Sequence, residues 1–172
     1  TFETFINPGT PISQFITELT GITDQMLTSA PSIDTVLPIL IEFIGSPNET
    51  VFVAHNASFD LSFLKAASND YGYLWPDFRV IDTVKAARQV LTKDDVTNYQ
   101  LGTLAQYFRT SVTPNHRALD DALATVDVLH GVIERMGTFG VSTINQMLNT
   151  GNRLSKKRLA AKAMTESTPP NP

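Results

Sequence analysis

The sequence predicts an α/β domain in which helices pack on a mixed sheet. Two observations carry this prediction. Short runs of apolar and β-branched residues alternate along the chain with longer segments whose apolar residues recur at helical spacing. The 172 residues also suffice for one hydrophobic core, and a composition of 42% hydrophobic and 17% charged residues is that of an ordinary globular domain.

The segment before residue 50 predicts one strand followed by helices. Residues 2–6 mix aromatic and β-branched side chains and end at an Asn-Pro-Gly turn, which predicts a short strand. Segments with helical apolar spacing or helix-capping residues follow at 17–20, 23–27 and 32–44. Gly21 and Gly45 come directly after two of these segments and are expected to end the helices.

Strands and helices alternate more regularly in the rest of the chain. Residues 51–54 are apolar at every position, which is typical of a strand covered on both faces. Residues 78–81 predict a second strand, and Asp82 with Thr83 is expected to cap the helix that follows. The further helices are expected after residue 57 and at 83–90, 101–108, 119–136 and 144–148. The longest places on one side Leu119, Leu123, Val126, Leu129, Ile133 and Met136.

The composition changes after Gly151. Basic residues gather there, namely Arg153, Lys156, Lys157, Arg158 and Lys162, and the chain ends in a Pro-containing stretch. We therefore predict a globular domain over residues 1–150 and a basic, Pro-containing linker or tail over residues 151–172.

The bulk composition excludes several classes of protein. Because Cys is absent, disulfides and thiolate metal sites are ruled out. No apolar run reaches the roughly 20 residues of a membrane span, and no secretory signal pattern opens the chain, so we expect a cytoplasmic protein that does not enter a membrane. The net charge of −4 argues mildly against a module that only binds nucleic acid, because such modules are usually basic. An enzyme that holds metal with carboxylates can be acidic.

Two clusters of polar residues are candidates for chemistry. The first runs from His55 to Asp60 directly after strand 51–54, so Asp60 is expected near the carboxyl end of the sheet, where ligands bind in open α/β folds. The second places His116 five positions before Asp121, which opens the longest helix. Taken singly, each cluster is explained better by acidic residues that stabilise a helix N-terminus.

Together the two clusters resemble the DEDDh exonucleases, and among them the proofreading epsilon subunits of bacterial DNA polymerase III and their relatives. The matching residues are Ala54-His55-Asn56-Ala57-x-Phe59-Asp60 and His116-Arg117-Ala118-Leu119-Asp120-Asp121-Ala122. Shorter matches follow the family's order at 5–8, 19–23, 30–31, 81–88 and 99–105. The resemblance covers residues 2–136.

This resemblance implies a ribonuclease-H-like fold and a 3′→5′ exonuclease that uses two divalent ions, Mg²⁺ or Mn²⁺. In the family four carboxylates hold the ions, which activate a water and stabilise the leaving 3′ oxygen of the terminal phosphodiester. By position, Asp60 and Asp121 are metal ligands and His116 is the general base. Asp120 is adjacent but out of register, and we expect it to be a surface or capping residue. The residues expected to support the site are His55, Asn56 and Asp82.

The chain departs from the family pattern in one respect. The family's first strand carries Asp-x-Glu, but no Asp in this sequence is followed two positions later by Glu. The match begins at the family's third strand, and the first residue is Thr1 rather than Met. We therefore expect the N-terminal strands of the fold to be missing, with the sheet completed from outside this sequence. The chain alone, with two of the four carboxylates, is expected to be inactive or weakly active.

The expected partner is a single-stranded or frayed DNA 3′ end, met in replication proofreading or in repair. The basic segment that starts at Arg153 is similar to the linker that joins some relatives to a GIY-YIG nuclease domain, although a solvated tail explains it equally well. A polymerase is the other expected partner. Two alternatives stay open: a 3′→5′ exoribonuclease, and a non-catalytic relative that binds nucleic acid or a partner protein.

Overall fold

The computed structural model describes residues 1–149 and 154, and it confirms an α/β arrangement. The elements are α1 (Gln14–Thr20), α2 (Asp24–Leu27), α3 (Ile33–Ile44), β1 (Val51–Ala54), α4 (Ala57–Asp70), β2 (Arg79–Asp82), α5 (Thr83–Val90), α6 (Leu101–Phe108), α7 (Ala118–Gly137) and α8 (Ile144–Asn149). Each helix predicted from the sequence is present within a few residues of its predicted bounds.

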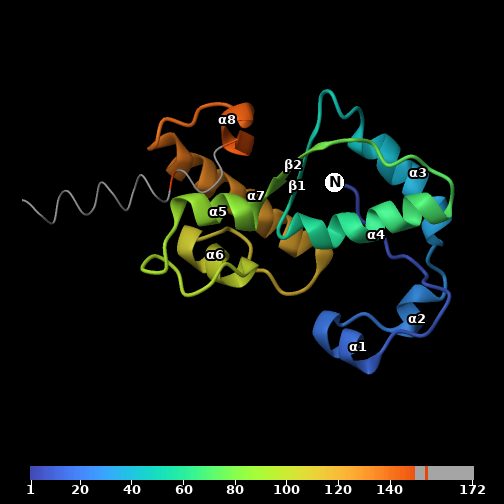
Figure 1. The fold of residues 1–172 in the computed structure, drawn as a ribbon. Coiled ribbons are helices and arrows are strands. Elements are labelled where there is room, and N and C mark those ends of the chain that lie inside the picture. Colours follow the sequence, from blue (N-terminus) through green and yellow to red (C-terminus); the bar gives the residue numbers. More distant parts are fainter. Residues whose placement is uncertain (150–153, 155–172) are drawn as a thin grey trace, which may run out of the picture.

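The sheet of the described residues consists of β1 and β2, which run parallel. Val51 pairs with Arg79 and Ala54 pairs with Asp82, and α4 is the crossover that a parallel pair requires. Figure 1 shows this sheet between α3 and α4 on one side and α5 to α8 on the other. Because the two strands end level, the residues that follow β1 and β2 meet at the same carboxyl edge of the sheet.

The helix ends follow the local rules that the sequence predicted. Gly21 ends α1 in the left-handed conformation, with φ 72°, which costs glycine little because it has no Cβ. Thr23 caps α2. The carboxylate of Asp82 caps α5 by accepting hydrogen bonds from the backbone N–H groups of Val84 at 2.9 Å and Lys85 at 3.4 Å.

The main core lies where α5, α6 and α7 pack together beside β2. α7 contributes a stripe of mostly small side chains at four-residue spacing that is almost fully buried: Ala124, Val128, Val132 and Met136. Gly131 lets α6 approach closely, since a Cβ at this position would lie 2.3 Å from the ring of Phe108. Leu154 is helical and buried in this core, and the rest of the predicted linker 151–172 lies outside the described residues.

The apolar side predicted for α7 is wrong in part. Leu123, Val126 and Ile133 were expected to pack inward, but they are 40–47% exposed. The helix has two apolar faces. The face with small residues is buried in the core because α5 and α6 can pack closely on it. Among the described residues, no helix or strand buries the second face, which carries Leu123, Val126 and Ile133.

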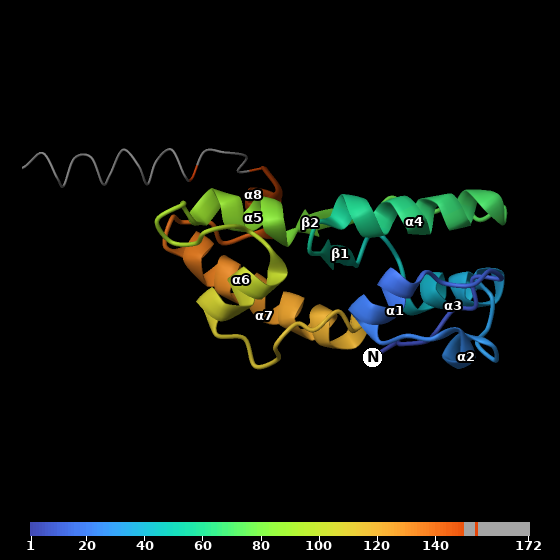
Figure 2. The same cartoon turned by 90° about the horizontal axis from the view of Figure 1, so that it is seen from below.

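Residues 2–6 do not form the predicted strand. Figure 2 draws this segment as a coil without an arrow, and the ring of Phe2 lies 5.4 Å from that of Phe43. An extended segment becomes a strand only when its N–H and C=O groups find a neighbouring strand, and the described residues offer none here. For the same reason residues 51–54 are half-buried, whereas the sequence predicted a strand covered on both faces.

None of the helices among the described residues is long and apolar enough to cross a membrane.

Candidate active site

The turn that follows β1 is fastened to the start of α5. The Nδ1 atom of His55 lies 2.8 Å from the hydroxyl of Thr83, which itself lies 3.5 Å from the carbonyl oxygen of Ala54. The backbone N–H of Asn56 donates to the Oδ1 atom of Asp82 at 3.3 Å. Thr83 and Asp82 therefore tie the turn to the helix cap. The predicted supporting residues His55, Asn56 and Asp82 do lie together.

Asn56 takes a backbone conformation that few residues adopt. Its φ is 66°, in the left-handed region where Asn is tolerated better than most side chains, and it is the N-cap position of α4. This conformation turns the chain sharply out of the sheet. As a result Asp60, in the first turn of α4, follows the carboxyl end of β1 as the sequence predicted.

The carboxyl group of Asp60 sits in an environment that disfavours its charge. The side chain is largely exposed, yet partial burial of the carboxyl raises its pKa, and the negative charge of Asp82 raises it further. A hydrogen bond from the backbone of Asp60 and the proximity of His55 act in the opposite direction. A cation placed beside this carboxylate would relieve the repulsion between the two acids.

His55 connects the acidic residues of the site. Burial is the largest influence and lowers the pKa of its imidazole. A hydrogen bond with the backbone of Tyr99 raises the pKa, as do the negative charges of Asp82, Asp60 and Asp121. Carboxylates from α4, from the end of β2 and from α7 thus act on one imidazole. The two predicted metal ligands, Asp60 and Asp121, are both close enough to influence it.

Asp121 holds the loop that carries His116. Its Oδ1 atom accepts hydrogen bonds from the backbone N–H groups of Asn115 at 3.0 Å and His116 at 3.3 Å. The side-chain amide of Asn115 donates to Asp120 at 2.7 Å, which agrees with the surface role expected for Asp120. The loop therefore bends back onto the first turn of α7, with its shape set by two neighbouring carboxylates.

His116 combines an exposed side chain with a backbone conformation that few residues adopt. Its φ is 66°, a strained conformation for a side chain with a Cβ, and such strain is often found at functional sites. The imidazole is exposed and makes no hydrogen bond with another residue of the described part of the chain. It is therefore available to a substrate, while its backbone is fixed by Asp121.

The structure adds two residues that sequence reasoning missed. The sequence indicated Thr83 only as part of a helix cap and did not single out Asn115. Hydroxyl and amide side chains beside candidate site residues were the available signal. The sequence could not show that the parallel register of β1 and β2 brings Thr83 to His55.

The carboxylates of Asp60 and Asp121 are suitable ligands for a divalent cation, but two carboxylates are too few for a pair of ions. Carboxylate oxygens are the donors that Mg²⁺ and Mn²⁺ prefer. However, the described residues hold no group of three or more His, Asp or Glu side chains arranged to bind a metal ion. Asp60 and Asp121 therefore do not by themselves make a site for a pair of ions.

The comparisons with known proteins decide the family. The model of the RNase_T family, described as exonuclease, matches residues 1–129. The chain belongs to the RNase_T exonuclease family. The matched segment includes both polar clusters and ends inside α7.

Relatives of this exonuclease domain occur in much longer proteins. A protein of Mycobacterium tuberculosis (strain CDC 1551 / Oshkosh), described as a bifunctional exonuclease/endonuclease, is 42% identical over 171 residues, which are 99% of this chain and 26% of the relative. A PolC-type DNA polymerase III of Caldanaerobacter subterraneus is 41% identical over 147 residues, 86% of this chain and 10% of the relative. The chain thus spans about a quarter and a tenth of their lengths.

A solved structure confirms the fold of the exonuclease domain. Exonuclease X in complex with 5′ overhanging duplex DNA matches with a TM-score of 0.59 and 29% identity, covering 84% of this chain and 76% of that chain. The α/β arrangement is thus that of an exonuclease, consistent with the expected ribonuclease-H-like fold.

Proposed function

We propose that this domain provides the 3′→5′ exonuclease activity of a larger protein that removes nucleotides from DNA ends in replication proofreading or repair. The proposal is carried by His55 in a chain of the exonuclease family: the charges of Asp60 and Asp121 both act on its imidazole. The backbone of His116 is in turn bound to Asp121. The relatives support DNA as the substrate, because one is a DNA polymerase and Exonuclease X was solved with DNA.

In this proposal Asp60 and Asp121 supply part of the oxygen ligands for Mg²⁺ or Mn²⁺, and His116 is the general base. The remaining ligands come from outside the described residues or from another chain, because those residues do not complete a metal site. Asp121 has a second task. By accepting hydrogen bonds from the backbone of the loop, it fixes the position of His116 relative to the carboxylates.

The proposed partners follow from the same relatives. The match to the bifunctional exonuclease/endonuclease extends over residues 151–172, which supports a second nuclease domain joined to this one by the basic linker. The PolC-type relatives support association with a polymerase as the other possibility. A DNA 3′ end, single-stranded or frayed, is the proposed substrate in both cases.

A digestion assay on the full-length protein tests the proposal. Single-stranded DNA labelled at its 5′ end should yield a ladder of progressively shorter products in Mg²⁺ or Mn²⁺, and none in EDTA. An RNA of the same sequence should be degraded more slowly. Faster loss of the RNA would favour the exoribonuclease alternative. Absence of digestion by protein whose Asp-x-Glu motif is present would favour the non-catalytic relative.

A further inference from the structure

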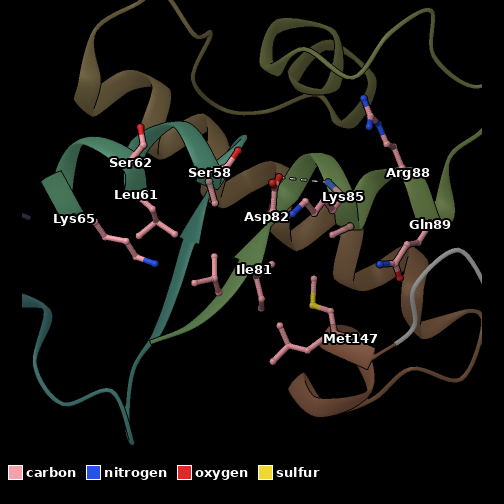
Figure 3. Close-up of a pocket in the computed structure, with 14 residues that line it drawn as sticks. Ser58, Leu61, Ser62, Lys65, Ile81, Asp82, Lys85, Arg88, Gln89 and Met147 are labelled. Carbon is pink, nitrogen blue, oxygen red and sulfur yellow. Dashed lines mark hydrogen bonds between the residues drawn. The ribbon is translucent and has the colours of Figure 1, made fainter. Parts of the chain in front are cut away.

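A cavity of about 750 Å³ lies between α4, β2, α5 and α8 (Figure 3). Val80, Ile81 and Asp82 all line it. Successive residues of a strand point to opposite faces of the sheet, so a cavity that touches three in a row runs along the edge of the strand. β1 pairs with one edge of β2, and no strand among the described residues pairs with the other.

Two lysines reach into this cavity from opposite walls. Figure 3 shows Lys65 extending from α4 toward Ile81, and Lys85 extending from α5 to the neighbourhood of Asp82. Neither ammonium group forms an ion pair or a hydrogen bond with any residue of the described part of the chain. The Oδ1 atom of Asp82 already accepts from backbone N–H groups. The cavity therefore has positive charge to offer a ligand.

The rest of the wall is mixed: aliphatic side chains lie beside the polar side chains of Ser58, Ser62, Arg88 and Gln89. Leu61 of α4 and Ile81 of β2 lie across the cavity from Met147 of α8. Leu148 of α8 also lines it. No aromatic side chain lines it among the described residues, whereas sites for single-stranded nucleic acid usually stack bases on aromatic rings. The lining thus suits a ligand that combines aliphatic groups with carboxylates.

We propose that this cavity binds an extended acidic segment of a partner protein, which adds to the free edge of β2 as a third strand. Main-chain hydrogen bonds to the strand edge would give affinity, as in other cases of strand addition. Alternate side chains would give specificity, with aliphatic groups against Leu61 and Met147 and carboxylates between Lys65 and Lys85. The chain's own segment 151–172 is basic and lacks this complementarity.

The proposal is tested by fluorescence anisotropy with the full-length protein and a fluorescein-labelled peptide, Glu-Val-Glu-Leu-Glu-Val. We expect saturable binding that Lys65→Glu and Lys85→Glu each weaken by about tenfold or more. Lys93→Glu makes the same charge change at an exposed lysine that does not line the cavity, and it should leave binding unchanged. Methylating alternate peptide nitrogens should also abolish binding, because a ladder needs those N–H groups.

Four outcomes would overturn the proposal: no binding of the acidic peptide, equal loss in the Lys93 variant, undiminished binding of the N-methylated peptide, or displacement of the peptide by a dT oligonucleotide at equal charge. The last would indicate a nucleic-acid site. Lys65→Ala and Lys85→Ala provide a second pair of variants should a charge reversal fail to give the parent circular dichroism spectrum. The digestion assay is read separately, so failure here leaves the proposed exonuclease function standing.

Discussion

The imidazole of His55 lies 2.8 Å from the hydroxyl of Thr83, and this contact joins the ends of two parallel strands. Thr83 is fully buried, and its hydroxyl also reaches the carbonyl of Ala54. The turn that leads to Asp60 is therefore positioned by a residue 28 places after His55 in the chain. Such outer contacts commonly fix the orientation of residues that act on a substrate or a metal.

The first prediction concerns Thr83 as a positioning residue. Thr83→Val keeps the shape of the side chain and removes the hydroxyl, so in the full-length exonuclease we expect kcat to fall by about 10–100-fold with little change in KM. Thr83→Ser keeps a hydroxyl and should restore most of the rate. Steady-state digestion of DNA by both variants measures the effect, and equal kcat values for the valine variant and the parent would refute it.

The second prediction concerns pH. Since burial lowers the pKa of His55 below its ordinary value of 6.5, the unfolded chain takes up a proton first as the pH falls. The contribution of His55 to the free energy of unfolding is therefore fully present above pH 6.5. It is lost as the pH drops toward the pKa of His55 in the folded protein. An NMR titration of the imidazole should show the lowered pKa, and His55→Asn should flatten this part of the stability profile. A titration midpoint at or above 6.5 would contradict the burial seen here.

The third prediction separates the two tasks of Asp121. In Asp121→Asn the amide oxygen can still accept from the N–H groups of Asn115 and His116, so the loop should keep its shape while the charge is lost. In Asp121→Ala both are lost. Hydrogen exchange of the His116 amide should be slow in the parent and the Asn variant and faster in the Ala variant. Equal exchange in all three would show that Asp121 does not hold the loop.

The fourth prediction tests the packing of α6 on α7. A Cβ at Gly131 would lie 2.3 Å from the ring of Phe108, so Gly131→Ala should destabilise the domain by about 1–3 kcal/mol, which exceeds the usual gain from Ala in a helix. Gly137→Ala, at the end of the same helix, meets no atom within 4 Å and should be neutral or slightly stabilising. Denaturant melts compare the two variants. A milder effect at Gly131 than at Gly137 would be inconsistent with this packing.

The sequence predicted the helices well because capping residues, glycine stops and apolar spacing are local signals. It predicted residues 2–6 as a strand and strand 51–54 as covered on both faces, and both predictions failed because a strand depends on neighbours that local patterns do not reveal. The burial of α7 also could not be predicted from local patterns. The helix has two apolar faces, and packing against other helices buries the one with small residues.

The candidate site was predicted only in part. Asp60, His116 and Asp121 were found from two motifs taken together, since each motif alone is explained by helix capping. Their roles as ligands and base remain predictions. Thr83 and Asn115 were not found, because their importance rests on contacts that the strand register and the loop conformation create.

The most direct test of the account is the rate at which the full-length protein digests 3′-labelled single-stranded DNA when His116 is changed to Ala. The imidazole is exposed and makes no hydrogen bond within the described residues, so the variant should fold like the parent. If His116 is the general base, the rate should fall by about 10²–10⁴-fold at saturating Mg²⁺. A variant that digests the DNA as fast as the parent would contradict the proposed site.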